Sequence, residues 1–125
     1  MKTPKRILLV DDDQLILGLL SERLTRSGYK MFTATNAAAA ILLLAENQID
    51  LLLLDILIGE DDGFELFQKI RQNLPEMPAI FLSGIRAEDE LFQLELKKTG
   101  CVCLSKRTTV TDLVRAIETA LQPRI

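Results

Sequence analysis

The sequence contains no histidine among its 125 residues. This absence excludes metal sites built on imidazole, Ser-His catalytic triads and any role as a phosphohistidine carrier. Whatever chemistry the protein supports must therefore use carboxylates, hydroxyl groups and lysine.

Excess positive charge and long apolar segments are also missing. The net charge is −3, and the basic residues are scattered apart from two short pairs, so we expect no nucleic acid contact by this domain. The first apolar run, residues 7–10, is too short for a signal peptide or a membrane span. We expect a cytoplasmic protein without membrane contact.

Cysteine is limited to Cys101 and Cys103, which are separated by one residue inside a predicted strand. We expect the two side chains to point to opposite faces of the strand, where they cannot readily form a disulfide. Both are therefore predicted to be reduced thiols.

Apolar runs alternate with segments of helical periodicity along the whole chain. A composition of 48% apolar and 26% charged residues suits one globular domain, residues 1–125. The predicted strands are 7–10, 31–35, 51–54, 79–82 and 101–104, and the predicted helices are 14–27, 36–47, 62–73, 88–98 and 110–121. Strict alternation predicts an α/β fold, a five-stranded parallel sheet covered by helices on both faces.

Polar residues follow four of the five predicted strands. They are Asp11, Asp12 and Asp13 after the first strand, Asp55 after the third, Ser83 after the fourth and Lys106 after the fifth. In such folds the carboxyl ends of the strands meet at one edge of the sheet, where ligands bind. We therefore expect these side chains to converge.

Clustered carboxylates repel one another unless they share a proton or bind a hard divalent cation, for which Mg²⁺ (or Mn²⁺) is suited. A lysine and a hydroxyl beside them favour phosphoryl transfer onto a carboxylate, which would make Asp55 the nucleophile. Taken singly, each residue has a simpler explanation. Asp13 and Asp62, for example, are best explained as turn or helix-cap residues.

Four blocks of the sequence, ILLVDDD, DLLLLDILIGEDDGFELF, PAIFLSG and LSK, closely resemble the receiver domain of two-component response regulators. The resemblance covers essentially the whole chain. It implies a flavodoxin-like fold with strand order 2-1-3-4-5. It also implies a signalling domain, not an enzyme, that is phosphorylated by a histidine kinase or a phosphotransfer protein and passes the signal on through a conformational change.

Each functional position of that family has a counterpart here. The resemblance implies that Asp55 is the phosphoacceptor and that Asp12, Asp55 and the Leu57 backbone carbonyl bind the metal directly, with Asp11 acting largely through water. Ser83 would bind a phosphoryl oxygen, and Lys106 would pair with the phosphate.

Three departures from the family pattern stand near the site. Ile58-Gly59 replaces the usual Met-Pro, so we expect a more mobile loop. Arg107 replaces the proline that usually follows the lysine in a cis bond, so we expect a trans peptide after Lys106. Cys103 stands at the switch position where an aromatic ring is usual, so either the output travels by another rearrangement or the activated state differs little from the resting one.

Two other functions remain open at this point. One is a receiver-fold binding module that is never phosphorylated. The other is a phosphatase of the haloacid dehalogenase type, because Asp11-Asp12-Asp13 resembles its D-x-D opening. Leu15 and the short chain do not fit that second family.

The predicted fourth helix carries more apolar surface than the core needs, which indicates a contact with a partner. Its apolar residues Leu91, Phe92, Leu94 and Leu96 spread over more of the helix than a core-facing stripe needs, so at least one should be exposed. We expect a homodimer or effector surface around Phe92 and Leu96.

Overall fold

The computed structural model describes residues 3–84 and 90–123, apart from the side chains of residues 90–92. The strands are β1 (Arg6–Val10), β2 (Lys30–Ala34), β3 (Leu51–Asp55), β4 (Leu57–Ile58), β5 (Asp61–Asp62), β6 (Ala79–Ser83) and β7 (Val102–Ser105). The helices are α1 (Gln14–Arg26), α2 (Ala37–Glu46), α3 (Gly63–Asn73), α4 (Glu90–Thr99) and α5 (Val110–Leu121).

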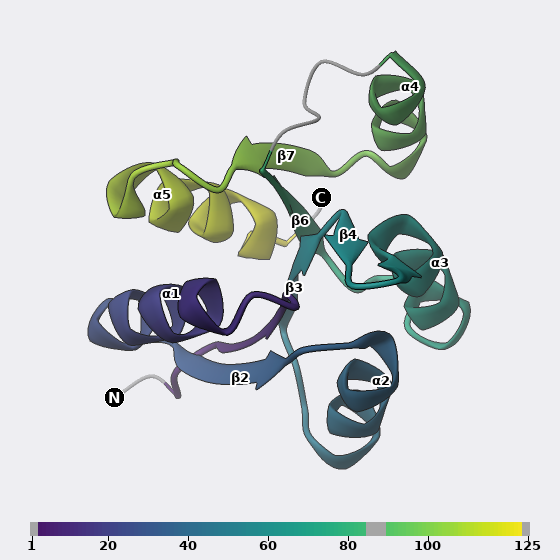
Figure 1. Ribbon diagram of the computed structural model, residues 1–125. Coiled ribbons are helices and arrows are strands. Elements are labelled where there is room, and N and C mark those ends of the chain that lie inside the picture. Colours follow the sequence, from purple (N-terminus) through teal and green to yellow (C-terminus); the bar gives the residue numbers. More distant parts are fainter. Residues whose placement is uncertain (1–2, 85–89, 124–125) are drawn as a thin grey trace.

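The main sheet is parallel throughout and has the order β2-β1-β3-β6-β7. Because β4 and β5 form a separate small hairpin, this is the order 2-1-3-4-5 of the five principal strands, and the predicted flavodoxin-like fold is confirmed. Figure 1 shows α1 and α5 on one face of the sheet and α2 and α3 on the other, with α4 beside α3.

Two apolar clusters fill the space between the sheet and its helices. Alternate residues of each central strand face opposite layers, so β1 and β3 are buried on both sides. One cluster joins the sheet to α1 and α5, through Leu24 and Ile117 among others, and the second joins it to α2 and α3, through Ala40 and Phe67 among others. This double burial is why the strand residues 51–54 are four consecutive leucines.

Helix starts follow the capping residues in the sequence. Asp13, Asn36 and Asp62 each accept hydrogen bonds from backbone N–H groups in the first turn of α1, α2 and α3. The predictions that Asp13 and Asp62 act as helix caps are confirmed. Predicted element boundaries coincide with the observed ones or differ by one residue, and the predicted start of α4 at residue 88 lies outside the described residues.

The loop after β3 is a hairpin rather than an open turn. Strands β4 and β5 pair antiparallel, Gly59 at the turn has φ +62°, and Ile58 is buried in the cluster beneath α2 and α3. The Ile58-Gly59 pair, for which we expected mobility, therefore gives one buried anchor and one left-handed turn residue.

Gly63 holds this hairpin against the end of β3. Its N–H donates to the carbonyl of Ile56 over 2.7 Å, and a Cβ at this position would stand 2.1 Å from the carbonyl oxygen of Asp55. No side chain fits there, so glycine permits the close approach of two backbone segments.

The cysteine prediction was wrong in one respect. Cys101 and Cys103 both pack against the same cluster, beneath α2 and α3, because residues two apart on a strand share a face. Both are free thiols, as expected. Within the described ranges, no helix is long and apolar enough to cross a membrane.

We predict that Gly63→Ala destabilises the fold by roughly 3 kcal/mol, because the new Cβ forces the hairpin away from Asp55. Gly18→Ala is the matched control, since Gly18 lies within α1 with open space around it, and this change should stabilise the protein by roughly 0.5–1 kcal/mol. Urea unfolding measures both. Equal stability of Gly63→Ala and the parent protein would contradict the close approach.

Candidate functional site

Three carboxylates gather at the carboxyl ends of β1 and β3. Asp55 is the last residue of β3 and is 7% exposed, while Asp11 follows β1 and is 1% exposed. Val10 pairs with Leu54 in the sheet, so Asp11 and Asp55 stand at the same level on neighbouring strands. Asp12 is exposed beside them, and one oxygen from each of the three lies within 4.8 Å of the others.

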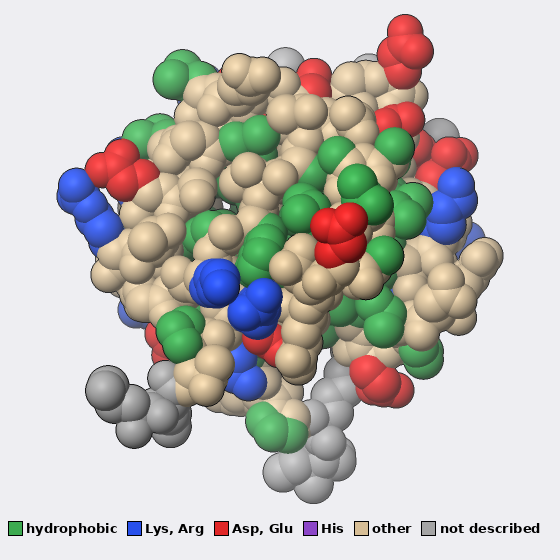
Figure 2. Space-filling model, turned by 90° about the horizontal axis from the view of Figure 1, so that it is seen from below, with side chains coloured by type: hydrophobic (Ala, Val, Ile, Leu, Met, Phe, Trp, Pro, Cys, Tyr) green, Lys and Arg blue, Asp and Glu red, His purple; other side chains and the backbone are tan. Residues whose placement is uncertain are grey.

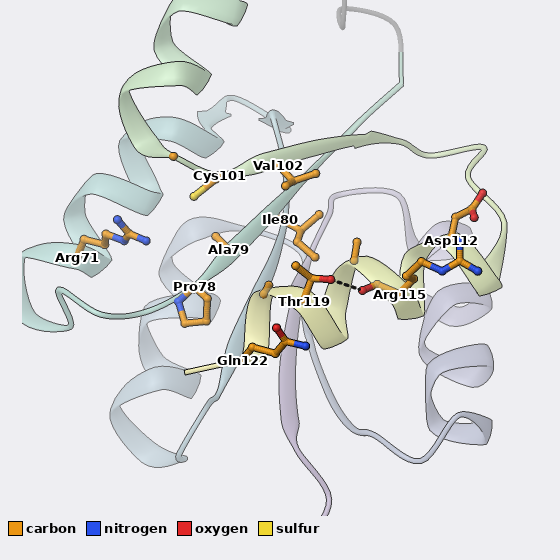
Figure 3. Close-up of a pocket in the computed structure, with 13 residues that line it drawn as sticks. Arg71, Pro78, Ala79, Ile80, Cys101, Val102, Asp112, Arg115, Thr119 and Gln122 are labelled. Carbon is orange, nitrogen blue, oxygen red and sulfur yellow. Dashed lines mark hydrogen bonds between the residues drawn. The ribbon is translucent and has the colours of Figure 1, made fainter. Parts of the chain in front are cut away.

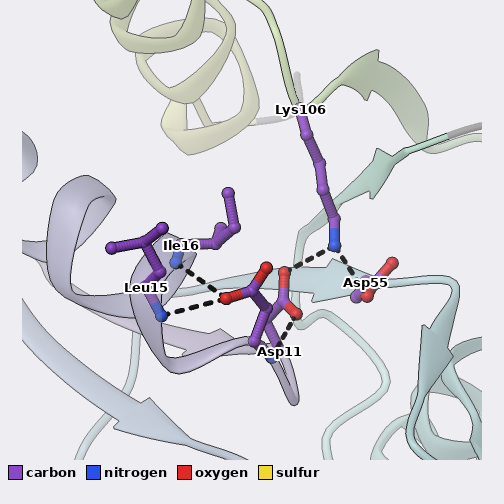
Figure 4. Close-up of polar contacts among 6 residues, drawn as sticks. Asp11, Leu15, Ile16, Asp55 and Lys106 are labelled. Carbon is purple, nitrogen blue, oxygen red and sulfur yellow. Dashed lines mark hydrogen bonds and ion pairs between the residues drawn. The ribbon is translucent and has the colours of Figure 1, made fainter.

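Lys106 reaches into this cluster from the end of β7. Its backbone N–H donates to the carbonyl of Ser83 over 2.9 Å, which aligns the ends of β6 and β7. Its ammonium Nζ lies 2.8 Å from Asp11 Oδ2 and 2.9 Å from Asp55 Oδ2, as Figure 4 shows. A single cation thus bridges the two buried carboxylates.

The surroundings of Asp55 disfavour its charged form. Burial raises the pKa of its carboxyl group, Lys106 lowers it through a hydrogen bond, and nearby Asp11 raises it again, with a net rise. Burial lowers the pKa of Lys106, but the two carboxylates outweigh this effect and raise it overall. The lysine stays charged, and the Asp55 carboxylate is poorly solvated.

The first of the three consecutive aspartates is held by the third. Asp11 Oδ1 accepts a hydrogen bond from the N–H of Asp13 over 2.9 Å, while Asp13 Oδ1 caps α1 through the N–H groups of Leu15 and Ile16 (Figure 4). Asp13 is therefore a structural residue that orients Asp11. Asp12, between them, is left facing solvent at the mouth of the cluster.

The cluster fits a hard divalent cation. Asp11 Oδ2 is buried and makes an ion pair with Lys106, but no hydrogen bond of good geometry reaches it. Three carboxylates outnumber the single ammonium, and oxygen ligands at this spacing suit Mg²⁺ or Mn²⁺. The acidic pocket can thus hold a metal ion through Asp11, Asp12 and Asp55.

The remaining predicted residues lie around these four. Ser83 is the buried last residue of β6 and pairs in register with Ser105, beside Lys106. Leu57 begins β4 with its side chain 52% exposed. Cys103 is half-buried, and burial raises the pKa of its thiol.

Two residues near the site were not expected from the sequence. Gly63 allows the hairpin to close on Asp55, and Asp61 Oδ2 accepts a hydrogen bond from the N–H of Ala37 over 3.0 Å, which ties the hairpin to the start of α2. The Asp61-Asp62 pair before a predicted helix suggests a cap for α3, which is Asp62, but it gives no signal for the contact between Asp61 and α2. Nothing in the sequence signalled the approach at Gly63, because it joins two backbone segments in space.

A cavity of about 480 Å³ lies elsewhere, between β6, β7 and α5 (Figure 3). Residues from the beginnings of β6 and β7, including Ala79 and Val102, form part of its wall, so it lies away from the carboxyl ends where Asp55 stands. Arg71, Asp112 and Arg115 are its charged lining residues, none of them part of the carboxylate cluster. The candidate functional site is therefore the carboxylate cluster and not this cavity.

Residues 7–118 match the response regulator receiver domain family. The chain belongs to this family. It carries the receiver fold of two-component signalling proteins, and nothing in the comparisons supports the haloacid dehalogenase alternative.

Relatives in the family are transcriptional regulators. The chain is 41% identical to the transcriptional regulatory protein GlrR of Escherichia coli K12 over 65% of its own length and 18% of that protein. It is 36% identical to the alkaline phosphatase synthesis transcriptional regulatory protein PhoP of Bacillus subtilis over 74% of its own length and 39% of that protein. The chain therefore spans only about a fifth to two fifths of these relatives.

Solved structures agree with the fold. A CheY-like receiver domain protein from Methanospirillum hungatei JF-1 superposes with a TM-score of 0.86 at 28% identity, covering 95% of this chain and 94% of that one. A signal receiver domain from Pseudomonas fluorescens Pf-5 superposes with a TM-score of 0.85 at 29% identity, covering 95% of each chain.

Two further expectations have an outcome. The peptide bond after Lys106 is trans, as predicted, because no cis peptide occurs in the described ranges. On α4, Leu94 is 56% exposed, which confirms that at least one apolar residue faces solvent, while Leu96 is partly buried against the core. The side chain of Phe92 lies outside the described residues.

We predict that Asp55→Asn raises the melting temperature of the metal-free protein at neutral pH. The raised pKa means that the folded state binds the Asp55 proton more tightly than the unfolded state, so the charged form costs stability above the ordinary carboxyl pKa. The gain should shrink as the pH falls through the raised pKa and vanish in acid. Each kcal/mol corresponds to roughly 3–5 °C for a domain of this size.

Thermal unfolding in a chelator across a pH series measures this effect, with Asp12→Asn as the control. Asp12 is exposed, so its replacement should change the melting temperature less. A lower melting temperature for Asp55→Asn at neutral pH would show that the ion pair with Lys106 outweighs the burial of the carboxylate.

Proposed function

We propose that residues 1–125 act as one receiver domain that accepts a phosphoryl group on Asp55 from the phosphohistidine of a histidine kinase or a phosphotransfer protein. The observation that carries the proposal is the position of Asp55, buried at a strand end and bridged to Asp11 by the ammonium of Lys106. A poorly solvated carboxylate of raised pKa is a better nucleophile than an ordinary one.

In the transfer step, a carboxylate oxygen of Asp55 forms a bond to phosphorus while the phosphorus–nitrogen bond of the donor breaks. The donor imidazole keeps the electron pair of that bond and takes up a proton from solvent. Lys106, already 2.9 Å from the carboxylate, is placed to pair with the oxygens of the transferred group. The role is that of a signalling domain rather than an enzyme with turnover, and a cytoplasmic location accompanies it.

Asp11, Asp12 and Asp55, with the backbone carbonyl of Leu57, would hold Mg²⁺ or Mn²⁺. When bound, the cation neutralises the clustered carboxylates and the charge on the phosphoryl oxygens. Asp11 Oδ2, which is buried and receives no hydrogen bond of good geometry, and the exposed position of Asp12 support this assignment. Asp13 is not a ligand in this proposal because its carboxylate is engaged as a helix cap.

Ser83 and Lys106 would bind the phosphoryl group on Asp55 and change position when it is present. The hydroxyl of Ser83 binds a phosphoryl oxygen, and Lys106 shifts from Asp11 toward the phosphoryl group. A backbone hydrogen bond links these two residues, so a movement at one strand end is passed to the other. This route needs no aromatic ring at Cys103.

The output of the signal is also a proposal. The named relatives are transcriptional regulators much longer than this chain, which suits a receiver that controls an attached or separate effector. An effector or homodimer contact around Phe92 and Leu96 stays a prediction, with Leu94 as the exposed apolar residue of α4.

We expect the intact mass of the protein to increase by one phosphoryl group after incubation with Mg²⁺ and acetyl phosphate. Asp55→Asn should show no increase, and a chelator should suppress the increase in the parent protein. Intact mass spectrometry with a short quench measures all three. An increase in Asp55→Asn equal to that of the parent would remove Asp55 as the acceptor.

If the parent protein gains no mass from acetyl phosphate or from a phosphorylated kinase fragment, and binds no Mg²⁺, the unphosphorylated binding module becomes the better explanation. Steady hydrolysis of a small phosphomonoester would instead indicate a phosphatase. These outcomes separate the three candidate functions with one set of reagents.

We predict that Asp12→Asn weakens Mg²⁺ binding by about tenfold or more, because it removes a charged oxygen ligand. Asp13→Asn, the adjacent control, should leave the affinity within about twofold, since asparagine caps a helix as well as aspartate does. Isothermal titration calorimetry measures both affinities. Equal losses in the two variants would show only a general effect of acidic charge.

A further inference from the structure

The proposed ligands of the carboxylate cluster come from two separate parts of the chain. Asp11 and Asp12 directly follow β1, whereas Asp55 ends β3 and Leu57 begins the β4–β5 hairpin. Mg²⁺ demands a near-ideal octahedron with its oxygen ligands at about 2.1 Å. Contacts that fix the hairpin relative to the end of β1 therefore bear directly on metal binding.

Two contacts hold the hairpin to β3, α3 and the core. At its base, the N–H of Gly63 donates to the carbonyl of Ile56 over 2.7 Å. In its middle, Ile58 is 1% exposed and packs in the cluster beneath α2 and α3. Ile58 pairs with Asp61, and the turn residues 59 and 60 beyond this pair are exposed.

A third contact joins the hairpin to the start of α2. Asp61 Oδ2 accepts a hydrogen bond from the N–H of Ala37 over 3.0 Å. Three residues earlier, the carbonyl of Ala34 at the end of β2 accepts a hydrogen bond from the N–H of Asp11 over 3.1 Å. Residues 34–37 are thus bonded to Asp11 at one end and to the hairpin at the other. This short segment bridges the two groups of proposed ligands.

Helix α2 has fewer buried residues than α1, α3 or α5. Within residues 37–46, all of which the structure describes, Ala40 alone is buried, and Leu42 is 58% exposed. Figure 2, which views the side where α2 lies in Figure 1, shows apolar side chains at the surface there. Because packing contributes most of the stability of a helix, a helix that buries little depends more on the hydrogen bonds at its start.

We propose that Asp61 is a positioning residue of the metal site, which fixes the hairpin and its Leu57 carbonyl relative to Asp11 through the start of α2. The inference rests on the proposed function, in which the cluster holds Mg²⁺. Coupling between two equilibria is reciprocal. Bound Mg²⁺ therefore also strengthens the hydrogen bond between Asp61 and Ala37.

A role confined to the start of α2 is the competing explanation. A carboxylate near the first N–H groups of a helix stabilises that helix whether or not a metal is bound. Its loss would lower the stability of the protein without changing the Mg²⁺ affinity of the folded form. Asn36 supplies the matched control, because its Oδ1 accepts a hydrogen bond from the N–H of Ala39 over 2.8 Å, a bond in the same turn that does not join the hairpin.

Isothermal titration calorimetry with Mg²⁺ tests the proposal. We expect Asp61→Ala to weaken binding about tenfold, the lower end of the losses found when a contact that orients a metal ligand is removed. Asp61→Asn keeps an oxygen acceptor for Ala37 and should bind within about threefold of the parent protein, which separates position from charge. Asn36→Ala removes a cap of α2 and should stay within about twofold. Circular dichroism establishes that each variant is folded.

Amide hydrogen exchange, followed by NMR, tests the reciprocal effect. Saturating Mg²⁺ should slow exchange of the Ala37 N–H about tenfold more than that of the Ala39 N–H, because the coupling has the same size in both directions. The Ala39 amide corrects for the general stabilisation that any bound ligand gives. In Asp61→Ala the two amides should respond to Mg²⁺ equally.

Unchanged Mg²⁺ affinity in Asp61→Ala, or equal losses in Asp61→Ala and Asn36→Ala, would overturn the proposal. Equal slowing of the Ala37 and Ala39 amides in the parent protein would overturn it as well. In each of these cases the parent protein still binds Mg²⁺, so the proposed phosphoryl transfer to Asp55 would stand. A parent protein that binds no Mg²⁺ would overturn both the metal site and the role of Asp61.

Discussion

The site depends on the repulsion between two carboxylates that the sheet holds side by side. Asp11 and Asp55 stand level on neighbouring parallel strands and are almost completely buried. One ammonium, from Lys106, bridges them, and the third carboxylate, Asp12, faces solvent. The single ammonium of Lys106 therefore does not neutralise the three carboxylates. A bound cation or a phosphoryl group would change the net charge of the cluster.

The buried carboxylate of Asp55 lowers the stability of the folded protein, but it also supplies the reactive group of the proposed transfer. Burial and the neighbouring Asp11 raise the pKa of Asp55, so its charged form weakens the folded state. The same poorly solvated carboxylate is the reactive group in the proposed transfer. Because the buried charges of the unmodified site are not fully compensated, its side chains can rearrange when a charged group is added. This property suits a signalling domain.

Contacts to backbone atoms hold the surroundings of the cluster in place. Gly63 closes the β4–β5 hairpin on Asp55, Asp61 ties that hairpin to α2, and the hydrogen bond from Lys106 to Ser83 aligns the ends of β6 and β7. These contacts connect the site to two different parts of the molecule. One is the start of α2, and the other is the edge of the sheet at β7.

The strand–helix alternation, the helix caps and the residues that converge at the strand ends could all be predicted from the sequence, because burial periodicity and capping are local properties of the chain. It did not reveal the hairpin after Asp55 or the need for glycine at 63, and it misplaced Cys101 relative to Cys103. The tertiary structure brought Asp11, Asp55 and Lys106 within ion-pairing distance and left Ile41 and Leu42 of α2 exposed. These features depend on contacts between segments distant in sequence, whose geometry the packing of helices on the sheet decides.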